Sequence, residues 1–276
     1  MYKYLCQACG KSFEANRRNR EYCSRACQHR ANNDKVGERL AMNDLVAAWA
    51  CGGGVDSTTI AALIIEGALP KPDLAYMVDC GWECEGTWKY VYGETIPRLK
   101  AAGVELHILK SSDDGVDTSQ LVDKRGNVLI PAYSQRDGKP TKFSTHCNSR
   151  WKVMVARHWL RAQGVKRCEN WVGIALDESH RQHISPVRWC ENRYPLIEHE
   201  MTREDSVHYL GNHGWPLPPR TSCIICPQQR DSAWLRMKIK YPKDFERCVI
   251  AEKQIHITQP DVYLHRTMVP LSEVRL

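Results

Sequence analysis

Three consecutive glycines, Gly52 to Gly54, separate an apolar run at 45–50 (LVAAWA) from a stretch with the pattern of a helix. That stretch opens with Asp56, Ser57 and Thr58. Because glycine has no Cβ atom, the backbone N–H groups of such a turn can converge on an anion, and the helix dipole adds positive potential. The sequence therefore predicts a phosphate-binding loop at the end of a buried strand.

Two common phosphate-binding motifs do not fit this loop. A Walker P-loop requires Gly-x-x-x-x-Gly-Lys-Ser/Thr, and the loop contains no lysine. A dinucleotide fingerprint requires G-x-G-x-x-G, and Asp56 stands in the place of the last glycine.

The chain contains thirteen cysteines, and four of them lie in a short basic segment at 1–32. In a reducing compartment, cysteines are more often metal ligands or reactive thiols than disulfide partners. The spacing C-x-x-C followed by C-x-x-x-C predicts a tetrahedral zinc site whose ligands are Cys6, Cys9, Cys23 and Cys27. The excess of Lys and Arg in this segment favours docking onto nucleic acid, and a structural cap with a solvated basic face is the alternative.

Strand and helix patterns alternate along the rest of the chain, which predicts an α/β fold with a parallel, doubly wound sheet covered on both faces. Strands are expected at 45–50, 73–79, 104–110 and 170–176, and helices at 57–68, 87–103 and 150–164. The irregular residues 111–146 predict a flap or a β-hairpin insertion. The predicted units are a zinc-binding module (1–32), a connector (33–44), a nucleotide-binding α/β domain (45–186) and a helical C-terminal region (187–276).

Several motifs in this order resemble those of the PP-loop ATP pyrophosphatases and PAPS reductases. The glycine loop GGGVDS is similar to S-G-G-x-D-S, with glycine for the first serine. Further along, DCGWECEGT (79–87) resembles D-T-G-x-x-F-P-E-T, HCNSRWKV (146–153) resembles C-C-x-x-R-K-V, GIALDESHRQ (173–182) resembles G-I-R-x-D-E-S-x-x-R, and PPRTSCIICP (218–227) resembles a C-x-x-C-P segment. The departures are Cys80, Cys84, Gly86, His146 and the missing first arginine of the 173–182 motif.

The resemblance, which runs from about Leu45 to the C-terminus, implies the adenine nucleotide alpha-hydrolase fold of HUP type. It implies binding of ATP, or of a PAPS-like nucleotide, with Mg²⁺. The implied nucleotide-binding residues are Gly52, Gly53, Gly54, Asp56, Ser57, Thr58, Asp79, Gly81 and Thr87, and the implied catalytic residues are Asp56, Lys152 and Arg181. In this interpretation Asp56 binds Mg²⁺, and Lys152 and Arg181 clamp phosphate groups.

The resemblance also implies a second metal site. Iron–sulfur members of the family hold a four-iron cluster with a cysteine pair and a C-x-x-C motif, and Cys147, Cys223 and Cys226 stand at three of those four positions. His146 is the fourth ligand by alignment, and Cys190 is another candidate. Thiolates suit zinc as well as iron–sulfur clusters, so the nature of the metal stays open.

Two reactions are compatible with these motifs. A PAPS or APS reductase uses a nucleophilic cysteine in a C-terminal E-C-G-L-H segment and releases sulfite, but no cysteine follows Cys248 here. We therefore favour the chemistry of tRNA thiolases and DNA phosphorothioation sulfurtransferases, in which ATP adenylates an acceptor, pyrophosphate leaves and sulfur displaces AMP. The expected partners are tRNA or DNA, with a sulfur donor such as a cysteine desulfurase, and a homodimer is possible. A nucleic-acid-binding protein with a regulatory nucleotide site is the third class.

The amino-acid composition limits the class of protein and its expected location. With 42% hydrophobic and 26% charged residues the chain is an ordinary globular one. It has no apolar run near the ~20 residues of a membrane span, and its start lacks the apolar region of a signal peptide. The sequence thus predicts a cytoplasmic protein without a membrane partner.

Overall fold

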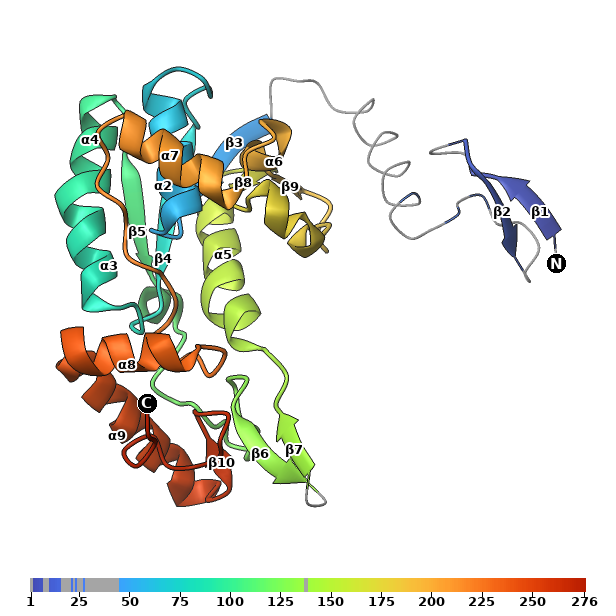
Figure 1. Cartoon of the computed structure of the whole chain (residues 1–276). Helices are drawn as coiled ribbons and strands as arrows, with labels where there is room; N and C mark the ends of the chain where they lie inside the picture. The colour runs from blue at the N-terminus through green and yellow to red at the C-terminus, as the bar shows by residue number, and fades with distance from the viewer. Residues whose placement is uncertain are drawn as a thin grey trace.

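The structure is a computed structural model, and it describes residues 2–6, 10–15, 21, 23, 27, 45–136 and 139–276. A five-stranded parallel sheet forms its centre, with the strand order β5–β4–β3–β8–β9 (Figure 1). The strands are β3 (Leu45–Ala50), β4 (Leu74–Asp79), β5 (Leu106–Lys110), β8 (Arg167–Val172) and β9 (Cys190–Arg193). The predicted α/β class with a parallel sheet is confirmed.

One face of the sheet is covered by the helices that follow β3 and β4, together with a later helix. These elements are α2 (Val55–Ile65), α3 (Glu85–Tyr90), the π-helix η2 (Val91–Thr95), α4 (Ile96–Ala101) and α7 (Arg203–Asn212). Ile60 of α2, Leu99 of α4 and Leu210 of α7 are fully buried in one core with Trp49 of β3. Thr202 is the N-cap of α7 in a capping box, in which its side chain accepts from the N–H of Asp205.

The other face is covered by α5 (Met154–Ala162), which continues from the π-helix η4 (Asn148–Val153) (Figure 1). Its buried Val155 and Leu160 pack in one core with Tyr76 and Val78 of β4. Apolar residues on only one side of α5 explain why it lies flat on the sheet. Helices on both faces make the sheet doubly wound, as expected from the alternating pattern.

A third core joins the insertion after β5 to the C-terminal part of the chain. It includes α8 (Asp231–Lys240), α9 (Pro242–Thr258), the predicted hairpin and a short strand that extends it. The hairpin strands are β6 (Tyr133–Arg136) and β7 (Lys139–Lys142), and β10 (Val262–Tyr263) pairs with β6. The carboxylate of Asp244 in α9 accepts from the N–H of Glu85 at 2.9 Å, which fixes this part at the start of α3.

Some boundaries differ from the sequence prediction. Strand β8 ends at Val172 rather than at residue 176, because Gly173 already presses against the start of α2. Strand β9 and helix α7 lie beyond residue 186, where the helical C-terminal region was expected to begin, yet both pack with the sheet. The sheet therefore uses chain from both sides of that predicted boundary.

The remaining elements are short. They are the antiparallel pair β1 (Tyr2–Leu5) and β2 (Ser12–Ala15), the 3₁₀ turns η3 (Ser111–Asp114) and η5 (Leu176–Arg181), and α6 (Pro195–Glu198). The predicted connector (33–44) lies outside the described residues. Among the helices that the structure describes, none is both long and apolar enough to cross a membrane.

Candidate functional site

The glycine loop joins the carboxyl end of β3 to α2. Gly53 has a φ of +70°, in the left-handed region that favours glycine. Gly54 is the N-cap of α2, and no side chain caps this helix end. The hydroxyl of Ser57 accepts a hydrogen bond from the N–H of Gly52 at 2.8 Å, which closes the turn. The first N–H groups of α2 are thus left for an anion, as the sequence predicts for a phosphate loop.

Close contacts explain two of the three glycines. A Cβ atom on Gly53 would lie 3.1 Å from the methyl carbon of Thr87 and 3.2 Å from a methyl carbon of Val91. A Cβ atom on Gly54 would lie 2.5 Å from Oγ1 of Thr221. Thr221 stands two residues before Cys223, so the C-x-x-C segment reaches the glycine loop.

The segment after β8 also meets the glycine loop, as the resemblance implies for 173–182. A Cβ atom on Gly173 would lie 3.2 Å from the backbone nitrogen of Ser57. Asp177 and Glu178 lie close enough for their charges to raise the pKa of Asp56 slightly. Three segments that are distant in sequence therefore meet at the start of α2.

Asp56 is buried and carries an ion pair that the sequence did not predict. Nη1 of Arg203, the first residue of α7, lies 2.6 Å from Oδ1 of Asp56. Burial raises the pKa of Asp56, and the Arg203 guanidinium offsets part of this effect. Because the guanidinium stands where a cation would bind the carboxylate, Mg²⁺ binding at Asp56 requires Arg203 to move. Nothing in the sequence around Arg203 marks it, apart from its place after the N-cap Thr202.

The turn after β4 holds the other predicted nucleotide-binding residues. The carboxylate of Asp79 accepts from the N–H of Gly81 at 2.7 Å, and Gly81 has a φ of +75°. Thr87 is fully buried, its methyl group faces Gly53, and its hydroxyl has no hydrogen-bond partner among the described residues. A buried hydroxyl without a partner beside a phosphate loop is suited to a ligand.

Each of the two predicted phosphate clamps forms an ion pair with a carboxylate. Arg181 is exposed and pairs with Glu178 in η5. Nζ of Lys152 lies 2.5 Å from the buried carboxylate of Glu83. Burial alone lowers the pKa of Lys152, but Glu83 and the sulfur atoms of Cys223 and Cys80 together raise it above its usual value. Lys152 therefore serves the cysteines rather than the phosphates in this structure, because its nearest anion is Glu83.

One cysteine of the second predicted metal site, Cys223, forms a group with Cys80 and Glu83, and the ligand atoms of these three residues lie within 4.8 Å of one another. Sγ of Cys223 lies 3.6 Å from Sγ of Cys80 and 3.9 Å from Oε1 of Glu83. Burial raises the pKa of Cys147, and the nearby sulfur atoms of Cys226 and Cys80 raise it further. We call Cys80, Cys147, Cys223 and Cys226 the cysteine cluster.

Neither predicted fourth ligand is part of this cluster. The side chain of His146 is exposed, and Cys190 lies on β9 opposite Cys168 of β8. The sequence did carry a signal for Cys80, because a cysteine stands there in place of the threonine of the family pattern.

The donor set of the cluster fits a thiophilic metal. With Zn–S bonds of about 2.3 Å, two sulfurs of a tetrahedral site lie roughly 3.8 Å apart. The Cys80–Cys223 separation of 3.6 Å is close to this value. Cysteine thiolates also hold iron–sulfur clusters, so the donor type suits either group, whereas the 3.6 Å separation matches a single metal ion.

The N-terminal cysteines show the same kind of grouping. The sulfur atoms of Cys6, Cys23 and Cys27 lie within 4.8 Å of one another. Cys6 accepts from the N–H of Gly10 through its backbone oxygen, at the knuckle after the first pair. The predicted ligand Cys9 lies outside the described residues. Three of the four predicted zinc ligands are therefore placed together.

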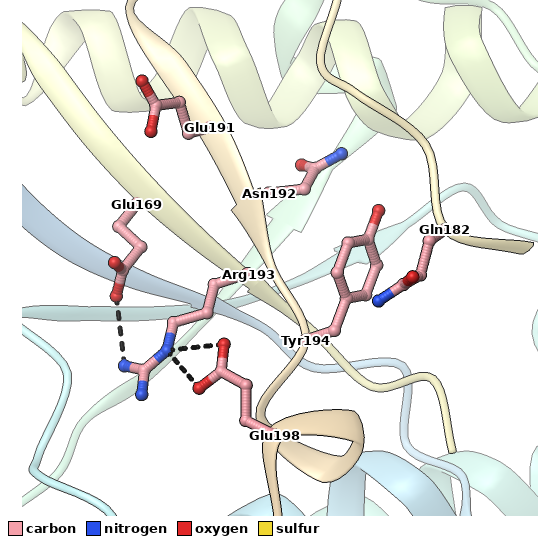
Figure 2. Close-up of a pocket in the computed structure, with 7 residues that line it drawn as sticks. All are labelled: Glu169, Gln182, Glu191, Asn192, Arg193, Tyr194 and Glu198. Carbon is pink, nitrogen blue, oxygen red and sulfur yellow. Dashed lines mark hydrogen bonds and ion pairs between the residues drawn. The ribbon is translucent and has the colours of Figure 1, made fainter. Parts of the chain in front are cut away.

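A pocket of about 260 Å³ lies elsewhere, along strand β9 (Figure 2). Arg193 lies in it between the carboxylates of Glu169 and Glu198, at 3.2 and 2.8 Å. Its lining residues are Glu169, Gln182, Glu191, Asn192, Arg193, Tyr194 and Glu198, and none of them is a predicted site residue. The two acidic partners neutralise the arginine, so this pocket is poorly suited to phosphate.

Comparisons with known proteins complete the description. No protein-family model and no curated protein matches the chain. Among solved structures, the U34-tRNA thiolase NcsA from Methanococcus maripaludis with its [4Fe-4S] cluster is similar at 14% identity and a TM-score of 0.43, over 93% of this chain and 89% of that one. PAPS reductase from Candida auris in its phosphate complex is similar at 16% identity and a TM-score of 0.42, over 68% of this chain and 80% of that one. With both TM-scores below 0.5, neither similarity says what this chain binds or does.

The geometry at Gly53 gives a first prediction. Gly53→Val places a side chain on the contact with Thr87 and blocks the loop amides, so ATP affinity falls more than about tenfold. Isothermal titration calorimetry measures the ATP affinity of the variant. Gly67→Val is the matched control, because Gly67 has a similar φ of +78° and no atom within 4 Å of its Cβ position. Equal ATP affinity in the two variants would contradict the phosphate loop.

The Lys152–Glu83 ion pair gives a second prediction. Lys152→Met leaves the buried Glu83 carboxylate without its partner and lowers the free energy of unfolding by about 2 kcal/mol, less than for a fully buried pair because Lys152 is 32% exposed. Lys152→Met/Glu83→Gln removes both charges and recovers most of the loss. Urea denaturation measures both variants. A double variant as unstable as Lys152→Met would show that the ion pair is not the cause.

Proposed function

We propose that this protein is an enzyme that binds ATP, or a PAPS-like adenine nucleotide, at the glycine loop and transfers sulfur to a nucleic acid. The observation that carries the proposal is the contact of Thr221 with Gly54, since it brings a phosphate loop and a cluster of cysteines to one end of the sheet. In open α/β sheets ligands bind at the carboxyl ends of the strands. A site that combines both features suits a reaction that uses a nucleotide and sulfur together.

The reaction has two steps. An oxygen atom of the acceptor attacks the α-phosphorus of ATP, and pyrophosphate leaves with Mg²⁺. A sulfur nucleophile from a donor, such as a cysteine desulfurase, then replaces the activated oxygen, which leaves in AMP. In the first step the loop amides and Thr87 hold the phosphates, and Asp56, once free of Arg203, would hold Mg²⁺, which would stabilise the charge of the leaving pyrophosphate.

The cysteine cluster serves the second step. A metal ion or an iron–sulfur group bound there supplies a thiophilic centre. Lys152 neutralises part of the negative charge of the thiolates, and Glu83 holds Lys152 in place. The Lys152–Glu83 ion pair thus lies beside Cys80 and Cys223.

Basic residues near the cluster support a nucleic-acid acceptor. Arg220 and Lys142 lie close enough to Cys226 for their charges to lower its pKa, against the larger opposing effect of burial. The segment 1–32 adds further basic residues around the proposed zinc site. Lysine and arginine groups of this kind bind phosphates and release counterions, so tRNA or DNA is the proposed acceptor.

The reductase alternative lacks a nucleophile. Cys248, the last cysteine of the chain, is fully buried in α9, and burial raises its pKa far above the ordinary value. Its sulfur lies 3.9 Å from the sulfur of Met237, inside the C-terminal core. A thiol in this position cannot attack a sulfonate.

Turnover experiments test the proposal. We expect release of pyrophosphate and AMP from ATP that rises at least about tenfold with tRNA or DNA, because uniform binding without a positioned acceptor does not speed the chemical step. Cys147→Ala, Cys223→Ala and Cys226→Ala each stop thiolated product while most pyrophosphate release continues. Sulfite release from PAPS would favour the reductase, and nucleotide binding without turnover would favour a regulatory site.

Removal of the N-terminal module gives a further prediction. Deletion of residues 1–32 removes one zinc per chain and weakens nucleic-acid binding with a smaller salt dependence, because fewer phosphate contacts remain. ATP affinity is unchanged, since the sheet begins at Leu45. Binding is measured by fluorescence anisotropy at several salt concentrations. Equal affinity of the truncated and complete chains for tRNA and DNA would identify the module as a structural cap.

A further inference from the structure

The three cysteines of the second predicted metal site leave one coordination position to be filled. Zinc in proteins is usually bound by four ligands, and a four-iron cluster by four cysteines. Within the described part of the chain, Cys80 is the other cysteine whose sulfur lies within 4 Å of a sulfur of this set, at 3.6 Å from Cys223. Cys80 comes from the turn after β4.

Several hydrogen bonds fix the backbone at Cys80. The hydroxyl of Thr118 donates to the Cys80 carbonyl at 2.8 Å. On either side, the Asp79 carboxylate accepts from the N–H of Gly81, and the Asp79 carbonyl accepts from the hydroxyl of Ser111. Cys80 itself is 1% exposed. Its sulfur is therefore held in position by the edge of the sheet rather than by a mobile surface loop.

The C-x-x-C segment is attached to the same turn. The N–H of Ile224 donates to the carbonyl of Trp82 at 2.7 Å, and Glu83 and Cys223 form an isolated antiparallel bridge. Within the motif, the N–H of Cys226 donates to the carbonyl of Cys223 at 2.9 Å. Backbone pairing thus sets the distance between Cys80 and Cys223 and does not depend on the conformation of the side chains alone.

One cation and one carboxylate lie beside the cysteines. The nearest cation is Lys152, whose ammonium group contacts Glu83 and lies among the sulfur atoms. Glu83 could offer an oxygen ligand, but it is already bound to Lys152.

We propose that Cys80, and not His146 or Cys190, is the fourth protein ligand of the metal centre formed with Cys147, Cys223 and Cys226. The inference rests on the metal centre of the proposed function and names its missing ligand. A centre with four cysteine ligands has no vacant position, which is the arrangement of structural sites, whereas catalytic zinc sites keep one position open. External sulfur can bind this centre only when one cysteine leaves.

Metal analysis of complete chains tests the ligand. The chains carry Cys23→Ser/Cys27→Ser, so that the remaining metal belongs to the cysteine cluster, and they are purified without oxygen. We expect Cys80→Ser to lower the metal per chain, or the affinity in competition with a chelator, by at least about tenfold. Cys84→Ser, in the same turn, is the matched control, and His146→Ala and Cys190→Ser test the other two ligands; all three are expected to keep the metal.

A second measurement keeps the test independent of the folding of a variant. X-ray absorption at the metal edge of the chain with Cys80 intact should show sulfur ligands alone, whereas a nitrogen ligand would overturn the inference. If Cys80→Ser keeps its full metal content, or if His146→Ala or Cys190→Ser loses the metal, Cys80 is not the fourth ligand. The metal centre itself would still stand. If the chain that keeps all four cysteines contains no metal, both the ligand assignment and the metal centre are overturned. ATP turnover would still test the remainder of the proposed function.

Discussion

The approach of three chain segments to the first turn of α2 is the constraint on which this site depends. Only a loop without Cβ atoms lets Thr221 reach Gly54, and only glycine at 173 lets the end of β8 reach Ser57. The strand order explains why they meet there. The chain runs from β3 outward through β4 to β5 and later returns to the other side of β3 as β8, and ligands bind where the direction of such a sheet reverses.

The local part of this arrangement could be predicted from the sequence. Strand β3 spans the predicted residues, the glycine loop has the expected conformation, and Thr202 begins α7 with its capping box. Each of these depends on neighbours within a few residues, where the type of side chain determines the backbone. The ion pairs of the site do not depend on residues that are close in sequence. The Lys152–Glu83 and Arg203–Asp56 pairs join residues 69 and 147 positions apart, and no periodicity indicates such partners.

The sequence interpretations of Cys80 and Lys152 missed contacts between residues that are far apart in the chain. Cys80 counted as a departure from the family pattern because that pattern has threonine at this position. In the fold, the turn after β4 lies against the C-x-x-C segment, and the sulfur of Cys80 lies 3.6 Å from that of Cys223. Lys152 counted as a phosphate clamp because a basic residue follows the cysteine in the family motif. Its burial beside Glu83 and the sulfur atoms gives it another anion to neutralise.

A single turn connects the two halves of the site. Residues 79–87 place Thr87 beside Gly53 of the glycine loop, and Cys80 and Glu83 beside Cys223. Because Asp79 is hydrogen-bonded to the backbone of Gly81 beside Cys80, a ligand that takes the carboxylate away from this N–H frees the backbone that positions the sulfur. Nucleotide binding and release of Cys80 from a closed centre would then be linked through one hydrogen bond.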